Sequence, residues 1–227
     1  MKFLVAFLLF FGFTIARAQT APYPGILQYK HQLKFSLMPQ IDPVNPGYEF
    51  GYEFQYAKRW ASQVSYAWLT DEIPALSNNR SDYYRFKGRR IGFEQKFFFP
   101  ETRSLHVHEY FGLELGHLEA HTVSDPVLKE LLQPGDVQPP IGWMSTDRYT
   151  FFINFKFGGE FPLFRHFLLD MSAGAGIKYR DVTNTFSNPQ MRDALIKWDI
   201  FNRYNPVKEW TGTMTFNMKI GYMFGRN

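Results

Sequence analysis

The chain has 227 residues, no cysteine and a formal charge of +4, and Lys2 and Arg17 of its N-terminal segment supply two of those charges. The lack of cysteine excludes a disulfide scaffold, a thiolate zinc site and cysteine catalysis. The near-balance of charge gives no reason to expect a nucleic-acid partner. Aromatic residues make up 19% of the chain, which is a high share for a soluble domain and is common in outer-membrane proteins.

Residues 1–18 have the features of a secretory signal peptide. Lys2 is the charged n-region, residues 3–15 form an apolar run, and small residues at positions 16 and 18 fit a cleavage site. The run is too short to span a hydrocarbon core of about 30 Å, and no basic stop-transfer cluster follows it. We therefore predict cleavage between Ala18 and Gln19.

The rest of the chain alternates apolar and polar residues with a period of two. In residues 48–56 and 214–224 every second residue is aromatic or aliphatic, and most of the residues between them are polar or glycine. A strand turns successive side chains to opposite faces, so each such segment has one apolar and one polar face. The pattern predicts eight strands, at residues 30–38, 47–57, 60–69, 83–99, 105–118, 148–161, 166–180 and 210–224.

The alternation changes phase within the fourth predicted strand. Tyr84 and Phe86 lie at even positions, whereas Ile91 and Phe93 lie at odd ones. One extra residue in a strand, a β-bulge, produces such a shift. We therefore predict a bulge near residues 88–90.

The predicted connections alternate in length along the chain. Connections of two to five residues follow the second, fourth and sixth strands, and long ones follow the others, at 39–46, 70–82, 119–147 and 181–209. Short turns on one rim and long loops on the other are typical of transmembrane barrels, with the long loops outside the cell. Most of the segments also reach the 9–11 residues that a tilted strand needs to cross a membrane.

These patterns predict an all-β fold, an eight-stranded antiparallel up-and-down transmembrane β-barrel. Residues 19–227 form its single domain, and an even number of strands places both termini on the periplasmic side. Two loops have weak helical patterns, at residues 125–132 and 189–204, and are expected to pack on the barrel mouth. The side chains expected to face lipid include Phe50, Phe54, Phe155, Met171 and Phe216.

The last strand ends at Tyr222-Met223-Phe224, with three residues behind it. An amphipathic strand that ends on an aromatic residue resembles the C-terminal assembly signal of outer-membrane barrels, although these three extra residues depart from it. Over nearly all of the mature chain, the strand pattern resembles the small outer-membrane β-barrel superfamily of the eight-stranded OmpA/OmpX kind. The aromatic strands and the glycine-rich inner face are similar to uncharacterised barrel proteins of Bacteroidetes.

The resemblance implies an architecture and a membrane, and it implies no particular activity. It implies an integral location in the bacterial outer membrane, in contact with outer-membrane lipid and lipopolysaccharide. It also implies insertion by the outer-membrane barrel assembly machinery and a monomeric state.

Charged residues recur on the polar faces of the predicted strands. An eight-stranded barrel is just wide enough inside to be filled by side chains, and buried charges need partners. We therefore expect paired charges that close the lumen. The alternative is a narrow polar conduit, which glycines on the same face favour. The predicted lumen charge network is Glu49, Glu53, Glu94, Lys96, Glu114, Lys156, Asp170, Lys178 and Lys219, and further inward residues are Lys34, Arg85, Lys87 and Arg89.

His117, Glu119 and His121 lie two residues apart and so share one face of a strand near the outer rim. Histidine and glutamate bind zinc or copper. One strand supplies three ligands only if it twists or bulges, so we expect a solvated strand end. His106 and His108 have the same spacing, and we expect a solvated strand end there too. No metal or other cofactor is predicted.

Some eight-stranded barrels modify lipid A with a serine, a histidine and an acid. Such chemistry needs a serine that an adjacent histidine activates. No His-x-Ser step occurs in this sequence, which leaves only a non-adjacent serine such as Ser124 or Ser172. We expect no catalytic residues and a structural role, or recognition through loops 119–147 and 181–209. The alternatives are a narrow passive pore for small polar solutes and a lipid A-modifying enzyme.

Overall fold

The computed structural model describes residues 29–40, 42, 44–71, 85–100, 107–124, 142–187 and 206–226. The predicted signal peptide, its cleavage site and the two helical loop patterns lie outside these residues. The elements are β1 (Tyr29–Ser36), η2 (Met38–Gln40), β2 (Gly47–Ala57), β3 (Trp60–Thr70), β4 (Arg85–Phe98), β5 (His108–Ser124), β6 (Met144–Phe164), β7 (Phe167–Phe186) and β8 (Val207–Arg226). No helix within the described residues is long and apolar enough to cross a membrane.

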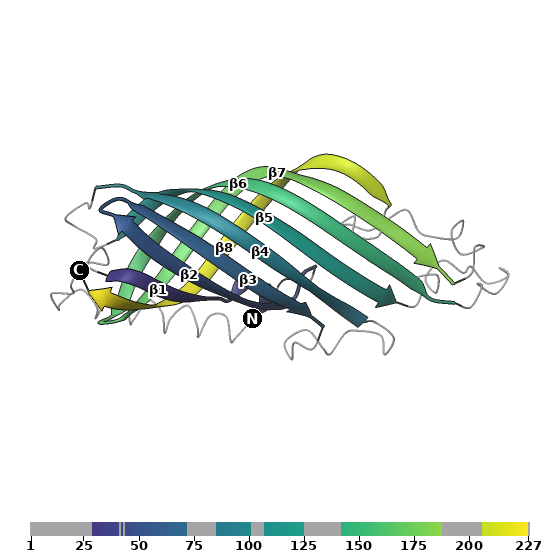
Figure 1. The fold of residues 1–227 in the computed structure, drawn as a ribbon, viewed down its shortest axis with the longest axis horizontal. Helices are drawn as coiled ribbons and strands as arrows, with labels where there is room; N and C mark the ends of the chain where they lie inside the picture. Colours follow the sequence, from purple (N-terminus) through teal and green to yellow (C-terminus); the bar gives the residue numbers. More distant parts are fainter. Residues whose placement is uncertain are drawn as a thin grey trace, which may run out of the picture.

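The eight strands close into a barrel in sequence order. Each strand pairs antiparallel with the next, and β1 pairs with β8 from Tyr29 opposite Arg226 to Ser36 opposite Lys219. The strands run obliquely across the barrel, as closure of a sheet requires (Figure 1). The predicted fold class, an all-β antiparallel up-and-down barrel, is confirmed.

The connections alternate between short and long, as predicted. Lys58–Arg59 join β2 to β3, and Arg165–His166 join β6 to β7. The first residue of β1 and the last of β8 are paired at this same rim. The short turns, the start of β1 and the end of β8 therefore lie at one rim, opposite the long connections.

Four strands extend further toward the long-loop rim than predicted. β5 continues to Ser124, β6 begins at Met144, β7 continues to Phe186 and β8 begins at Val207. The added residues include several threonines, which favour strands and pair across β5, β6 and β7. The apolar alternation ends before the pairing does, so a pattern of hydrophobicity alone places these ends too early.

The predicted bulge in β4 is wrong. The pairing of β4 with β3 and with β5 runs without a shift through residues 88–90. Phe86 instead points inward and is buried against Leu69, Leu118 and Ala120. Phe86 therefore fills the lumen near the rim, and an apolar residue on the inner face gave the alternation a false change of phase.

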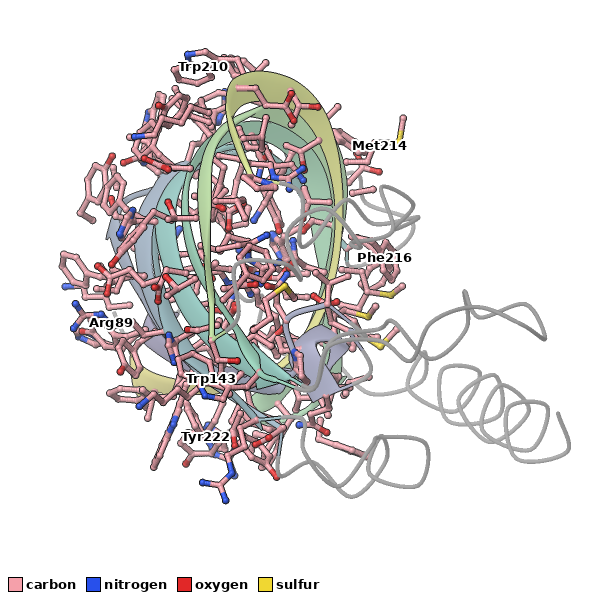
Figure 2. All side chains as sticks on the ribbon, turned by 90° about the vertical axis from the view of Figure 1, so that its right-hand side faces the viewer. Arg89, Trp143, Trp210, Met214, Phe216 and Tyr222 are labelled. Carbon is pink, nitrogen blue, oxygen red and sulfur yellow. The ribbon has the colours of Figure 1, made fainter. Side chains whose placement is uncertain are left out.

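Apolar side chains cover the outside of the barrel. The five residues expected to face lipid all lie on this outer face, and Phe50 keeps 61% and Phe155 56% of its surface exposed. Figure 2 looks into the barrel from the long-loop end, with Met214, Phe216 and Trp210 on the outside of the ring and nitrogen and oxygen atoms gathered within it.

Aromatic residues border this apolar belt at both rims. Trp60 and Tyr222 are exposed near the short turns, and Trp68 and Trp210 are exposed toward the long loops. Beyond the border near the long loops the outer face becomes charged, and Lys208 pairs with Asp181 at 3.0 Å. The belt therefore ends where polar surface begins, as in barrels that span a bilayer.

Candidate functional site

The short-turn half of the barrel interior is filled by charged side chains. We call nine of them the lumen charge cluster, and each is supplied by a strand that turns one face inward. Its members are Lys34, Glu53, Glu94, Lys96, Glu114, Lys156, Glu160, Asp170 and Lys219. The side chains of Lys34, Lys96 and Glu160 have no exposed surface at all.

Three carboxylates and two ammonium groups form the lower part of the cluster, which is the part nearer the short turns. Carboxylate oxygens of Glu53, Glu160 and Asp170 lie within 4.8 Å of one another. The Nζ atom of Lys34 contacts all three, at 2.8, 2.5 and 2.6 Å. The Nζ atom of Lys96 also contacts all three, at 2.9, 3.0 and 2.7 Å.

This arrangement resembles a carboxylate metal site in its spacing, but two ammonium groups lie between the carboxylates. Each ammonium has the three acceptors that its three N–H bonds can use. The strands that supply the five groups are β1, β2, β4, β6 and β7. Ion pairing therefore ties together five of the eight strands across the lumen.

The upper part of the cluster is a second set of pairs. Lys156 contacts Glu114 at 2.8 Å and Glu94 at 3.3 Å, and Lys219 lies 3.7 Å from Glu94. Asn154 donates a hydrogen bond of 2.9 Å to Glu114. These contacts connect β8 to the strands on the opposite side of the barrel.

Apolar and aromatic side chains lie below the cluster. Phe98 and Tyr110 are buried with Ala61, and Leu168 is buried with Met223. The Tyr110 hydroxyl donates to Asp170 at 2.7 Å, and the Lys96 ammonium lies 4.1 Å from the centre of the Tyr110 ring. Tyr110 therefore joins the charge cluster to the apolar layer near the short turns.

Tyr110 has room because residue 158 is glycine. A Cβ at Gly158 would lie 2.6 Å from the Tyr110 ring and 2.8 Å from the backbone oxygen of Met171. We expect Gly158→Ala to lower the free energy of unfolding by about 1–3 kcal/mol, because the ring must move off Asp170. Urea unfolding in lipid vesicles measures this.

Gly212→Ala is the matched control, because a Cβ there meets nothing within 4 Å. Its effect should stay within about 0.5 kcal/mol. Equal effects of the two substitutions would show that Tyr110 has no requirement for the space at Gly158.

The structure brings together seven of the nine residues of the predicted network. Glu49 lies apart and pairs with Arg90, and Lys178 lies in the long-loop half of the lumen. Glu160 was missed, although its even position matches that of Lys156 on the same strand. Lys34 was named as inward but not as a member of the network, and it pairs with residues up to 136 positions away.

The predicted inward positions of Arg85, Lys87 and Arg89 are wrong. All three side chains are exposed, on the face of β4 opposite the buried Phe86. Because β4 has no bulge, its odd-numbered residues face outward along its whole length. Arg90 takes the inward place instead.

The histidine face near the outer rim lies on the outside of β5. Nε2 of His117 contacts Glu119 at 3.2 Å, and Glu119 pairs with Arg89 at 2.8 Å. His121 instead contacts Asp147 on β6 at 2.7 Å. His117, Glu119 and Arg89 therefore form one series of contacts, and His121 pairs separately with Asp147. His108 is buried facing inward, and His106 lies outside the described residues.

A cavity of about 510 Å³ lies above the lumen charge cluster, toward the long loops. Glu114 and Asn154 of the cluster region line it, and so do Phe152 of β6 and Lys178 of β7. Within the part of the chain that the structure describes, side chains therefore fill one half of the lumen and line a cavity in the other.

The fold and its surfaces define a closed eight-stranded antiparallel barrel that is apolar outside and charged inside. Comparison with models of protein families and with curated proteins gives no match. Among solved structures, the chain is similar to a major outer membrane protein from Thermus thermophilus. The TM-score is 0.42 at 9% identity, over 86% of this chain and 98% of that one. A function for this chain is therefore argued from its own surfaces.

Proposed function

We propose that this protein is an integral outer-membrane β-barrel with a structural or recognition role, neither an open pore nor an enzyme. The observation that carries the proposal is the inverted distribution of polarity. Large apolar side chains such as Phe50 and Phe155 are exposed all around the barrel, while Lys34, Lys96 and Glu160 are fully buried. Soluble proteins seldom expose apolar surface on this scale, whereas a bilayer favours it.

The orientation follows from the two rims. Short turns face the periplasm in outer-membrane barrels and long loops face outward. The first residue of β1 and the last of β8 are paired at the short-turn rim, which supports periplasmic termini. Membrane lipid and lipopolysaccharide surround a monomer in this proposal, and the barrel assembly machinery inserts it after the leader is removed.

A non-enzymatic role is supported by the lumen. Ser172 is buried there and shares a hydrogen bond with the phenol of Tyr110 rather than with an imidazole. The other serine considered, Ser124, ends β5 at the long-loop rim. Mass spectrometry of lipid A from cells with and without the gene tests this proposal, and an altered acyl or phosphate pattern would favour the enzyme.

We expect the protein to fractionate with the outer membrane and to migrate differently on a gel before and after heating. Intact barrels resist unfolding by detergent, so the unheated form is more compact. Full recovery in the soluble periplasmic fraction would remove the membrane assignment.

We expect no stable ion conductance in planar bilayers. The side chains of Lys34, Lys96 and Glu160 lie across the lumen with no exposed surface, and moving a paired charge out of this layer is costly. Glu114→Gln changes the upper part of the cluster and leaves the contacts of Lys34 and Lys96 intact. Discrete single-channel steps whose size changes in this variant would support the passive pore instead.

A further inference from the structure

Among the residues that the structure describes, none forms a strand beside part of the edge of β8. β1 is much shorter than β8, and their pairing ends at Ser36 opposite Lys219, followed by one hydrogen bond of 2.8 Å from Leu37 N to Met218 O. Among the described residues, positions 207–217 of β8 pair with β7 alone. In Figure 1 this part of β8, in yellow, curves along the upper side of the barrel, away from β1.

The described residues that face this edge belong to the connection between β1 and β2. Met38 and Pro39 of η2, together with Val44 and Asn45, line the same cavity as Thr213–Asn217 of β8. We call the unpaired edge and these four residues the lateral seam. It replaces strand pairing in one part of the barrel wall.

The lateral seam lies at the depth of the apolar belt. Trp210 and Tyr222, which border the belt on β8, are exposed on the outer face, and Met214 and Phe216 lie between them. If the proposed membrane location holds, the seam therefore faces the outer half of the bilayer. An unpaired strand edge in hydrocarbon is costly unless another group covers it.

The cavity reaches the outside of the barrel through this seam. Thr213, Thr215 and Asn217 line it from the inner face of β8. Met214 and Phe216 also line it, although both are on the outer face, and Met214 is 91% exposed. Figure 2 shows these two side chains on one side of the ring, outside it. A cavity lined by both faces of one strand opens past the edge of that strand.

The polar lining of the cavity is rich in cations. Arg90, Arg148, Lys178 and Arg180 line it against the carboxylates Asp42 and Glu114. Glu114 is already paired with Lys156. Within the described residues no carboxylate pairs with Lys178, and the charged groups that act on it are Arg148 and Arg180. Arg180 lies 3.8 Å from Glu209, so an anion bound here would chiefly offset the positive charge of Lys178.

We propose that the lateral seam admits one anionic amphiphile from the outer half of the bilayer. Its phosphate or carboxylate headgroup binds in the cavity beside Lys178, Arg148 and Arg180. Its acyl chain leaves past Met214 and Phe216 into the membrane. A volume of about 510 Å³ is in the usual range of ligand sites, and it holds a headgroup with part of a chain.

The test uses the protein purified from membranes in a neutral detergent, with native mass spectrometry as the readout. The probes are lyso-phosphatidylglycerol, lyso-phosphatidylcholine of the same chain length, and glycerol phosphate. We expect one bound lyso-phosphatidylglycerol, and binding of the choline lipid at least about tenfold weaker, since only the former has a net charge. Glycerol phosphate should displace neither.

Three results would overturn the proposal. Equal binding of the two lipids would show that charge does not select the ligand. Full displacement by glycerol phosphate would show a site for soluble anions. A dimer held through the β8 edge would show that a second copy covers the seam.

Lys178→Glu should reduce binding of lyso-phosphatidylglycerol by about tenfold or more, because it reverses a charge beside the headgroup. Lys87→Glu makes the same change on the outer face of β4 and should leave binding unchanged. Heat-modifiable migration shows whether each variant folds. Loss of that migration in the unaltered protein would remove the membrane proposal, whereas intact migration without lipid binding would remove this inference alone.

A second measurement does not depend on Lys178. The chain has no cysteine, so Thr215→Cys and Ser65→Cys each introduce a single thiol on the inner face. In vesicles, a lipid-soluble maleimide should label Thr215→Cys, beside the seam, much faster than Ser65→Cys, on β3 away from the cavity. Equal protection of both thiols would show that the seam is closed to lipid.

Discussion

Lys96→Met is expected to lower the free energy of unfolding by about 3–5 kcal/mol, because it leaves three buried carboxylates with only one cation among them. Lys96 contacts Glu53, Glu160 and Asp170, and only Lys34 would remain among these three acids. Methionine keeps the length of the side chain, so the lost charge dominates the effect. Urea unfolding of the folded barrel in lipid vesicles measures it.

Asp170→Asn is the informative comparison. Each lysine contacts three carboxylates, so removal of one acid leaves each ammonium with two. The loss should therefore be smaller than in Lys96→Met. A double variant, Lys96→Met with Glu160→Gln, should recover part of the loss, because one charge of each sign is removed. A loss in the double variant equal to the sum of the single losses would contradict a coupled cluster.

Phe155→Arg is expected to lower the free energy of unfolding in lipid by about 2–4 kcal/mol if this residue lies near the middle of the bilayer. Phe155 is exposed on the outer face of β6, and it stacks on Phe111 with ring centroids 5.9 Å apart. An arginine there must carry its charge into hydrocarbon. The measurement is again urea unfolding in vesicles.

Tyr149→Arg is the matched control on the same strand and the same face. Tyr149 is exposed nearer the long loops, directly opposite Asp181 of the charged rim on β7. The cost there should fall to about 0–1 kcal/mol, as it does near membrane interfaces. Equal costs at the two positions would show that the outer face of β6 does not cross a bilayer along its length.

The number of strands, their order and the outer face were all readable from local patterns. Period-two alternation is a property of neighbouring residues, so positions such as Phe50, Phe155 and Phe216 reveal their side of the wall without any distant contact. The alternation of loop lengths is equally local. The same rule failed at Phe86, because an apolar residue can fill the inside of a barrel as well as cover the outside.

The contacts inside the barrel depend on the register of all eight strands. Lys34 meets Glu160 although 126 positions separate them, and no local pattern selects Glu160 over Glu49 as a partner. Both glutamates face inward, and strand tilt and stagger decide their depth. Lys178, predicted to join the network, lies in the cavity for the same reason.

The amino-acid sequence thus determines the alternation, the strand count and the sign of each face, because these follow from covalent neighbours and side-chain direction. Only the closed structure decides which charges share a layer of the lumen and where pairing stops. The lateral seam is an example. β1 has eight residues and β8 has twenty, so part of β8 extends past β1 when the two strands pair to close the ring. Pairing between the first and last strands is the most distant contact in the chain, and no local pattern encodes its extent.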